Sequence, residues 1–304
     1  RLRISPVSGS SSSVSSREPG QEYLVTYVVR TPAGELATTY YEEPGKSGWQ
    51  EAPLIKGEED LAPLDYLPTN GIDVAKINEA WERLGDRGLG YVSINGIWQQ
   101  ACYLRGMDQM AMDPYLRRKW AIAFLEKLAD YLSAQVEALC RTHVEAFFIN
   151  ESYVGMGMSK RMFEEFVRPF DGRFVRIAKD AGKLVLYHDC GRCDALLESF
   201  AEMDIDYLEP LNPKAASGDV DPADAKRRIG ERVCLRGGFN HQLLSSGTPE
   251  EVRQEIIDCL EKLSPGGGYI LCPAAALQGG DRIENLSAYA EAAAEYCVKY
   301  GTLC

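Results

Sequence analysis

The sequence lacks any apolar run close to the about 20 residues that a membrane-spanning helix needs, and no pattern typical of a secretory signal peptide opens it. It also lacks a basic excess: 45 acidic residues against 33 lysines and arginines give a formal net charge of −12. This charge excludes nucleic acid and anionic membrane surfaces as partners. We therefore expect a cytoplasmic protein whose partners are small molecules or other proteins.

Histidine is scarce, with three residues, whereas cysteine occurs nine times. A secreted disulfide framework is not expected, because the cysteine count is odd and the chain of 304 residues is long. The thiols should therefore be reduced. Hydrophobic residues make up 45% of the chain and charged residues 26%, which excludes disordered, collagen-like and coiled-coil proteins.

The N-terminal part of the chain differs in composition from the rest. Residues 8–16 (SGSSSSVSS) form the one low-complexity stretch, so residues 1–20 are predicted to be a flexible segment or loop. Residues 21–43 hold two β-rich runs on either side of the turn sequence Thr31–Gly34, which predicts a hairpin. We assign residues 21–304, the hairpin included, to a single domain.

Short apolar runs then alternate with helical patterns. The six runs are YVSING (91–96), AFFIN (146–150), KLVLYH (183–188), DYLEPL (206–211), RVCLRGG (232–238) and GYILCP (268–273). Asp113-Pro114 predicts the start of one helix, Ser159 caps another that Pro169 should break, and Thr248-Pro249-Glu250-Glu251 forms a capping box.

This alternation predicts an α/β fold with a parallel sheet. The chain length favours a (β/α)8 TIM barrel with the N-terminal β-hairpin as an insertion, although only six of the eight strands can be placed. No glycine-rich dinucleotide fingerprint follows any strand, which weakens the Rossmann alternative.

In a barrel, catalytic residues lie at the carboxyl ends of the strands. The residues there are rich in metal-ligand types: Asn95-Gly96, Asn150-Glu151, His188-Asp189-Cys190, Glu209, Asn240-His241 and Cys272. His188 and Cys190 are two residues apart, so in an extended segment their side chains point to the same side. With Cys272 as a third ligand they would form a zinc site that leaves one position open for substrate.

Two other interpretations of these residues remain open. His188 and Cys190 can be a hydrogen-bonded histidine beside a buried structural cysteine. Cys190-Gly191-Arg192-Cys193 also has the C-x-x-C spacing of redox-active dithiols, although thioredoxin-like domains are much shorter than this chain.

From about residue 54 to the C-terminus the chain resembles the uroporphyrinogen decarboxylase superfamily. The resemblance is carried by HDCGRCDALLESFAEMDIDYLEPL, VCLRGGFNHQLLSSGTPEEVRQEIIDCLEKL and GGYILCPAAALQGGDRIENLSAYAEAA, after a linker-like LIKGEEDLAPL. It implies a (β/α)8 barrel. The arginine-rich segment of the decarboxylases is not found here, whereas the H-x-C pair and later cysteine of the corrinoid-dependent methyltransferases match His188, Cys190 and Cys272.

The resemblance to this second branch implies a zinc-dependent methyltransferase. Zn²⁺ would be bound by His188, Cys190 and Cys272, with Glu151, in FFINESYVG, as a fourth ligand, and all four residues are catalytic candidates. The chain contains no D-x-H-x-x-G cobalamin motif, so the corrinoid is expected on a separate partner protein.

We expect the methyl group to move from a methylated substrate, such as an aryl methyl ether, to the corrinoid cobalt. The predicted substrate-binding residues are Asn95, Trp98, Tyr153, Tyr187, Asn240 and His241. The alternatives are transfer from methyl-corrinoid to a coenzyme M-like thiol, a metal-free uroporphyrinogen-type decarboxylase, and a non-catalytic binding protein on a barrel scaffold. A homodimer is also compatible with the sequence.

Overall fold

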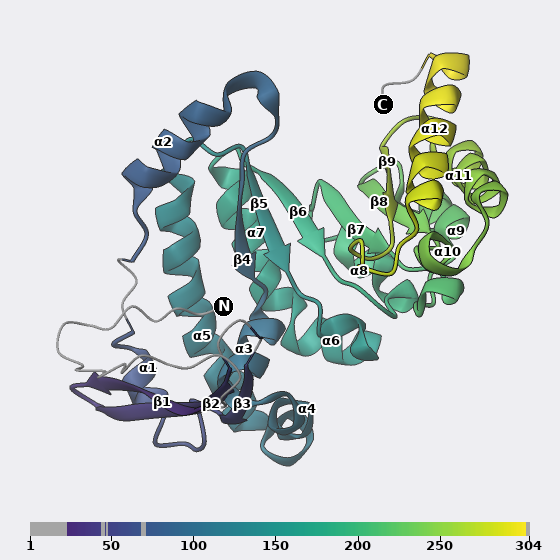
Figure 1. The fold of residues 1–304 in the computed structure, drawn as a ribbon. Helices are drawn as coiled ribbons and strands as arrows, with labels where there is room; N and C mark the ends of the chain where they lie inside the picture. The colour runs from purple at the N-terminus through teal and green to yellow at the C-terminus, as the bar shows by residue number, and fades with distance from the viewer. Residues whose placement is uncertain (1–22, 44–45, 47, 68–70, 302–304) are drawn as a thin grey trace. The chain divides into compact units, whose positions relative to one another are not determined.

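The computed structural model of the protein describes residues 23–43, 46, 48–67 and 71–301 (Figure 1). They separate into two compact units: residues up to 88 with 97–144 form the first, and residues 89–96 with those from 145 onward form the second. The predicted flexible segment, residues 1–20, lies outside the described residues. The assignment of residues 21–304 to a single domain stays a prediction.

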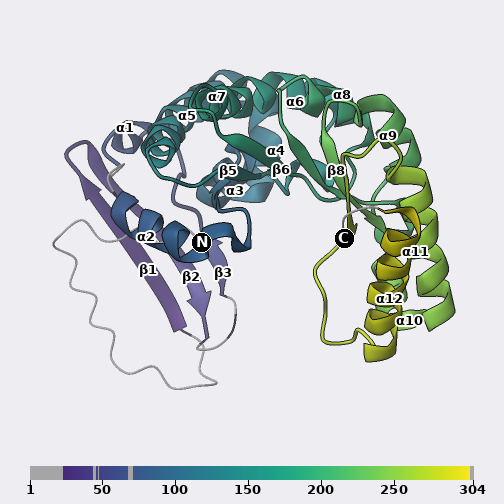
Figure 2. The same ribbon diagram turned by 90° about the horizontal axis from the view of Figure 1, so that it is seen from above.

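The first unit contains an antiparallel sheet in the order β1-β2-β3, and its strands are β1 (Tyr23–Thr31), β2 (Gly34–Glu42) and β3 (Trp49–Ala52). β1 and β2 lie side by side in Figure 2 and pair with Thr31 opposite Gly34, as the turn sequence predicts. The sequence did not indicate β3, because its four residues, WQEA, carry no alternating apolar pattern.

The helices of the first unit are α1 (Leu61–Leu64), α2 (Val74–Leu84), the 3-10 turn η1 (Gly85–Arg87), α3 (Ile97–Arg105), α4 (Met107–Leu116) and α5 (Arg118–Cys140). The predicted helix start at Asp113-Pro114 is wrong, because α4 continues through Pro114 and α5 begins only at Arg118. Asp113 caps no helix. It is buried and accepts a hydrogen bond of 2.7 Å from Nε of Arg105, a partner that a buried carboxylate requires.

The second unit is built on a parallel sheet in the order β4-β5-β6-β7-β8-β9. Its strands are β4 (Tyr91–Asn95), β5 (Ala146–Asn150), β6 (Leu184–His188), β7 (Tyr207–Leu211), β8 (Cys234–Phe239) and β9 (Tyr269–Pro273). All six predicted strands and the α/β class are thus confirmed. Within the residues that the structure describes, β4 and β9 are the two edges, so this sheet does not close into a barrel.

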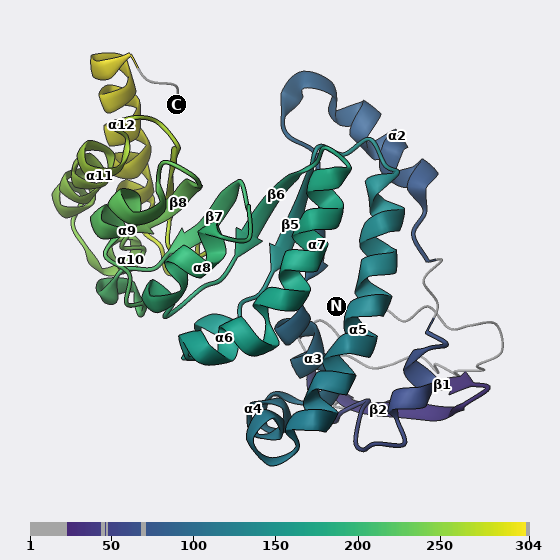
Figure 3. The ribbon, with the colours of Figure 1, turned by 180° about the vertical axis from the view of Figure 1, so that it is seen from behind.

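The helices that follow these strands are α6 (Lys160–Phe166), α7 (Arg168–Asp180), α8 (Leu197–Ala201), α9 (Pro222–Ile229), α10 (Gln242–Ser246), α11 (Pro249–Leu263) and α12 (Ile283–Tyr300), with 3-10 turns η2 (Val154–Met156), η3 (Asp194–Leu196) and η4 (Lys214–Ala216). Ser159 caps α6, as predicted. The helix is interrupted at Val167, between α6 and α7, shortly before Pro169. Thr248 and Glu251 form the predicted capping box of α11. Figure 3 shows α7 lying across one face of β5 and β6.

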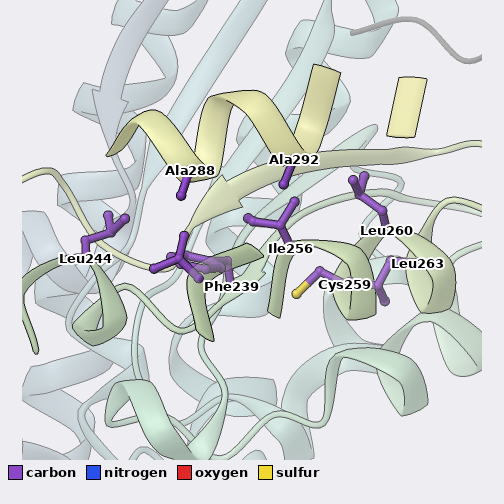
Figure 4. Close-up of a cluster of buried hydrophobic side chains, with 9 residues drawn as sticks. Phe239, Leu244, Ile256, Cys259, Leu260, Leu263, Ala288 and Ala292 are labelled. Atoms are coloured by element: carbon purple, nitrogen blue, oxygen red, sulfur yellow. The ribbon is translucent and has the colours of Figure 1, made fainter. Parts of the chain in front are cut away.

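The C-terminal part of the second unit has its own apolar core between β8, β9, α11 and α12. Ala288 and Ala292 point from α12 towards Phe239 of β8 and Ile256 of α11 (Figure 4). Tyr269 and Leu271 of β9 pack against the same cluster. Alternate residues of β9 therefore face away from these helices. No helix among the residues described here is both long and apolar enough to cross a membrane.

Candidate active site

Side chains alternate between the two sides of the sheet along the end of β6 and the two residues that follow it, so His188 and Cys190 point to the side opposite to Asp189. Tyr187 and Asp189 are fully buried on the side covered by helices, whereas His188 and Cys190 are only partly buried on the opposite side. We call this opposite side the inner face. The thiol of Cys190 is hydrogen-bonded to His188, and this bond lowers the pKa of Cys190 more than burial raises it. The predicted i, i+2 pair is therefore assembled.

Glu209 of β7 lies next to His188 in the sheet register and holds its imidazole. Nδ1 of His188 and Oε1 of Glu209 are 3.1 Å apart. Oε2 of Glu209 accepts hydrogen bonds from the Tyr207 hydroxyl and the Arg236 guanidinium. Burial alone would raise the pKa of Glu209, but these three donors outweigh it and hold the pKa at about 2.

The same contacts change the protonation of the histidine. Burial would lower the pKa of His188, but the hydrogen bonds with Cys190 and Glu209 raise it to about 9. At neutral pH the imidazole is therefore charged, and it lies between the Glu209 carboxylate and the Cys190 thiol, whose pKa it lowers.

Cys272 lies on the inner face of β9, in register with Gly238 of β8. Burial raises the pKa of the Cys272 thiol, and the charge of the neighbouring Arg236 lowers it by less. β7 and β8 separate Cys272 from His188 and Cys190. Among the described residues no three His, Cys, Asp or Glu side chains are grouped closely enough to hold a metal ion.

Glu151 belongs to a different group of side chains. It is fully buried, and a Cβ atom built on Gly96 would lie 1.9 Å from its Oε2 and 2.9 Å from Oδ2 of Asp171. The Tyr187 hydroxyl donates to Oδ2 of Asp171 at 2.7 Å. Burial, followed by the charges of Asp171 and Glu151, keeps the pKa of Tyr187 well above its usual value. The structure thus groups Glu151 with Asp171 and Tyr187 rather than with His188 and Cys190.

The predicted substrate-binding residues are only partly brought together. Tyr187 is fully buried and its hydroxyl donates a hydrogen bond to Asp171, so Tyr187 does not line an open surface. Trp98 is buried in α3, which belongs to the first unit. The others are partly buried and lie at or after the carboxyl ends of strands of the second unit: Asn95, Tyr153, Asn240 and His241.

Aromatic rings line the inner face beside His188. The centroid of the Phe148 ring lies 5.7 Å from that of His188, and the Tyr91 ring lies 5.6 Å from Phe148. Tyr91 is 55% exposed. β4, β5 and β6 therefore present a row of rings that ends at the histidine. Tyr91 and Phe148 could not be selected from the sequence, because neither lies at the carboxyl end of its strand.

The segment after β6 is held by the backbone of Gly155 in η2. The Gly155 N–H donates to Oδ1 of Asp189 at 2.7 Å, and its carbonyl accepts from the N–H of Arg192 at 2.7 Å. A Cβ atom on Gly155 would lie 1.9 Å from the carbonyl oxygen of Cys190, so only glycine fits. Gly155 thus sets the position of Cys190.

The C-x-x-C interpretation fits the structure poorly. Cys193 is 1% exposed, and burial keeps the pKa of its thiol well above the usual value. Reactive dithiols need accessible thiolates with a lowered pKa, which only Cys190 of this pair offers.

The sequence matches the family profile described as "Uroporphyrinogen decarboxylase (URO-D)" over residues 58–296. A curated uroporphyrinogen decarboxylase from Pseudoalteromonas translucida is 28% identical over 195 residues, which are 58% of this chain and 48% of that protein. One from Prochlorococcus marinus (strain NATL1A) is 24% identical over 251 residues, 78% of this chain and 67% of that protein. The chain thus spans about half the length of the first relative.

Among solved structures, one described as "methyltransferase from Methanosarcina mazei" is similar in fold, with a TM-score of 0.62. The match covers 84% of this chain and 74% of that chain at 15% sequence identity. At this identity the likeness concerns the fold alone.

Proposed function

Because the chain belongs to the uroporphyrinogen decarboxylase family, we propose that it is a zinc-dependent methyltransferase that works with a separate corrinoid protein. It would move a methyl group between a methylated substrate and the corrinoid cobalt. The observation that carries the proposal is the Glu209–His188–Cys190 arrangement. Histidines that bind a metal through one ring nitrogen commonly donate a hydrogen bond from the other to a carboxylate. This hydrogen bond fixes the orientation of the ring and raises its basicity.

The donor chemistry of the inner face fits zinc. Nδ1 of His188 faces Glu209, so Nε2 is the nitrogen left for a metal. Cys190 and Cys272 are free thiols on the same face of one sheet. One imidazole and two thiolates are a common zinc ligand set. His188 and Cys190 are already adjacent, whereas Cys272 must approach them. Glu151, buried beside Asp171, is a less suitable fourth ligand.

Zinc bound to these residues would supply Lewis acidity towards an ether oxygen or a thiol. The residues of the chain then have separate tasks. Glu209 fixes the ring of His188, and His188 lowers the pKa of the Cys190 thiol. A thiolate is the form that binds a metal, and a lowered pKa favours that form of Cys190.

Metal analysis tests the zinc site. We expect about one zinc per chain in the purified protein, and well below half an equivalent in His188→Ala, Cys190→Ser and Cys272→Ser, because each removes one of three ligands. Cys234→Ser is the matched control, since Cys234 is a half-buried cysteine at the opposite end of β8. Equal zinc content in all five proteins, or none in any, would refute the site.

We further propose an aromatic methyl ether as the methyl donor. The rings of Tyr91 and Phe148 beside His188 offer a flat apolar surface for an aromatic substrate. Supplied with reduced corrinoid protein and a panel of methoxyarenes, the enzyme should form methyl-cobalt, which its absorbance reports. If no methoxyarene reacts and a thiol such as coenzyme M demethylates methyl-cobalamin instead, the direction is reversed while the zinc site stands.

The curated relatives favour a second candidate, decarboxylation of uroporphyrinogen. An acidic tetrapyrrole requires unpaired cations. Near the strand ends, however, Arg236 is paired with Glu209, and Arg192 lies 3.8 Å from Asp219. Turnover of uroporphyrinogen by protein stripped of metal would establish this candidate and exclude the zinc proposal.

A further inference from the structure

Arg236 connects two parts of the proposed site that a metal would have to bring together. It lies on the inner face of β8, and its side chain is 35% exposed. Its guanidinium forms an ion pair with Oε2 of Glu209. The other oxygen of that carboxylate holds His188, so Arg236 is joined to His188 through Glu209.

On its other side Arg236 reaches β9. Ile270 pairs with Arg236, and Cys272 follows two residues later, so Cys272 emerges on the same inner face. Tyr269 and Leu271 point the opposite way, into the apolar core. The interaction of Arg236 with the Cys272 thiol completes a chain of contacts from β6 to β9. It runs from His188 through Glu209 and Arg236 to Cys272.

We propose that Arg236 is a positioning residue that takes the place of the metal's charge in the metal-free protein. It neutralises Glu209 and keeps the Cys272 thiol beside β8, and its ion pair competes with zinc. This inference rests on the proposed function. It accounts for the fact that the first two ligands are adjacent while the third lies apart beside a cation.

The physical reason is the permanence of the charge. A guanidinium does not lose its proton in proteins, so it cannot become neutral when a dication approaches. The repulsion falls only if the Arg236 side chain moves away, which breaks its ion pair with Glu209. Zinc binding therefore includes the cost of that movement. Removing the positive charge should make zinc binding tighter, the opposite of what a supporting residue would show.

The test compares Arg236→Gln with the wild type in zinc competition against a chromogenic chelator. We expect the variant to bind zinc at least about tenfold more tightly, because the competing cation is gone. Arg236→Lys keeps the charge and should bind as the wild type does. Arg232→Gln is the matched control, since it removes an exposed arginine just before the same strand, and it should leave the affinity unchanged.

A second readout needs no bound metal. In chelator-treated protein, the alkylation rate of Cys272 is followed against pH by peptide mass spectrometry. The loss of a neighbouring cation disfavours the thiolate, so the midpoint should shift upward by about one pH unit in Arg236→Gln and stay in place in Arg232→Gln and Arg236→Lys.

The proposal requires both results. Unchanged or weaker zinc binding in Arg236→Gln overturns it, and so does an unshifted Cys272 midpoint. If the wild type itself binds no zinc, the proposed function fails, whereas the alkylation midpoint still reports whether Arg236 contacts Cys272. Should circular dichroism show that the glutamine variant is unfolded, Arg236→Met, which keeps the apolar stem, carries the same expectations.

Discussion

Replacing Glu209 by alanine is expected to destabilise the protein by about 1–3 kcal/mol, the usual cost when the acceptor of largely buried hydrogen-bond donors is removed. The side chain of Glu209 is 9% exposed and accepts hydrogen bonds from His188, Tyr207 and Arg236. The alanine variant leaves all three donors without their acceptor. Urea unfolding at pH 7 measures the loss, and a wild-type midpoint in Glu209→Ala would contradict this account of the site.

The pH dependence of stability provides the control. The pKa of Glu209 is about 2 in the folded protein, below its ordinary value of 4.5. The folded state therefore favours the ionised form, and this stabilisation is complete above about pH 5 and is lost as the pH falls towards 2. Glu209→Gln cannot ionise, so its stability should change less with pH over this window. Zinc affinity should also fall by about 10- to 100-fold in Glu209→Gln, because the carboxylate that orients His188 is gone.

The six strands of the parallel sheet could be predicted from the sequence, because each is a short apolar run of five or six residues between helical patterns. The pairing of His188 with Cys190 followed for the same reason, since side chains two apart in a strand share a side. Local signals also located the capping box at Thr248 and the break before Pro169. All of these depend on residues a few positions apart.

Contacts between distant residues could not be predicted in this way. The pair Arg236–Glu209 joins residues 27 positions apart and requires β7 and β8 to be neighbours in the correct register. The one hint in the sequence was an arginine within the otherwise apolar run VCLRGGF. Asp113 is a similar case. A carboxylate before a proline is typical of a helix start, but in the structure the Asp113 carboxylate accepts a hydrogen bond from the buried Arg105 instead.

Burial decides the group to which Glu151 belongs. From sequence, an acidic residue after a strand is expected at the open rim of the barrel. In the structure the alternation along β5 turns Glu151 into the buried layer, beside Gly96 and Asp171. The alternation that places His188 on the inner face thus removes Glu151 from it.

Gly155→Ala is expected to disturb the site without changing any of its side chains. The added methyl group would lie 1.9 Å from the carbonyl oxygen of Cys190, a backbone atom that cannot rotate away. Overpacking of this kind costs about 1–3 kcal/mol, and a clash with backbone should fall at the upper end. To relieve it, the segment from Asp189 to Arg192 must move away from η2, which breaks the two hydrogen bonds that Gly155 makes with it.

Two other glycines separate this effect from general consequences of the substitution. Gly279 has open space around it and an ordinary backbone conformation, so Gly279→Ala should be neutral. Gly157 also has open space but a φ of +109°, so Gly157→Ala reports backbone strain alone, about 1–2 kcal/mol. Only Gly155→Ala should also shift the pH midpoint of Cys190 alkylation upward, because the thiol moves away from His188. If Gly155→Ala has the same free energy of unfolding as Gly279→Ala and keeps the wild-type pH midpoint of Cys190 alkylation, Gly155 does not position the thiol.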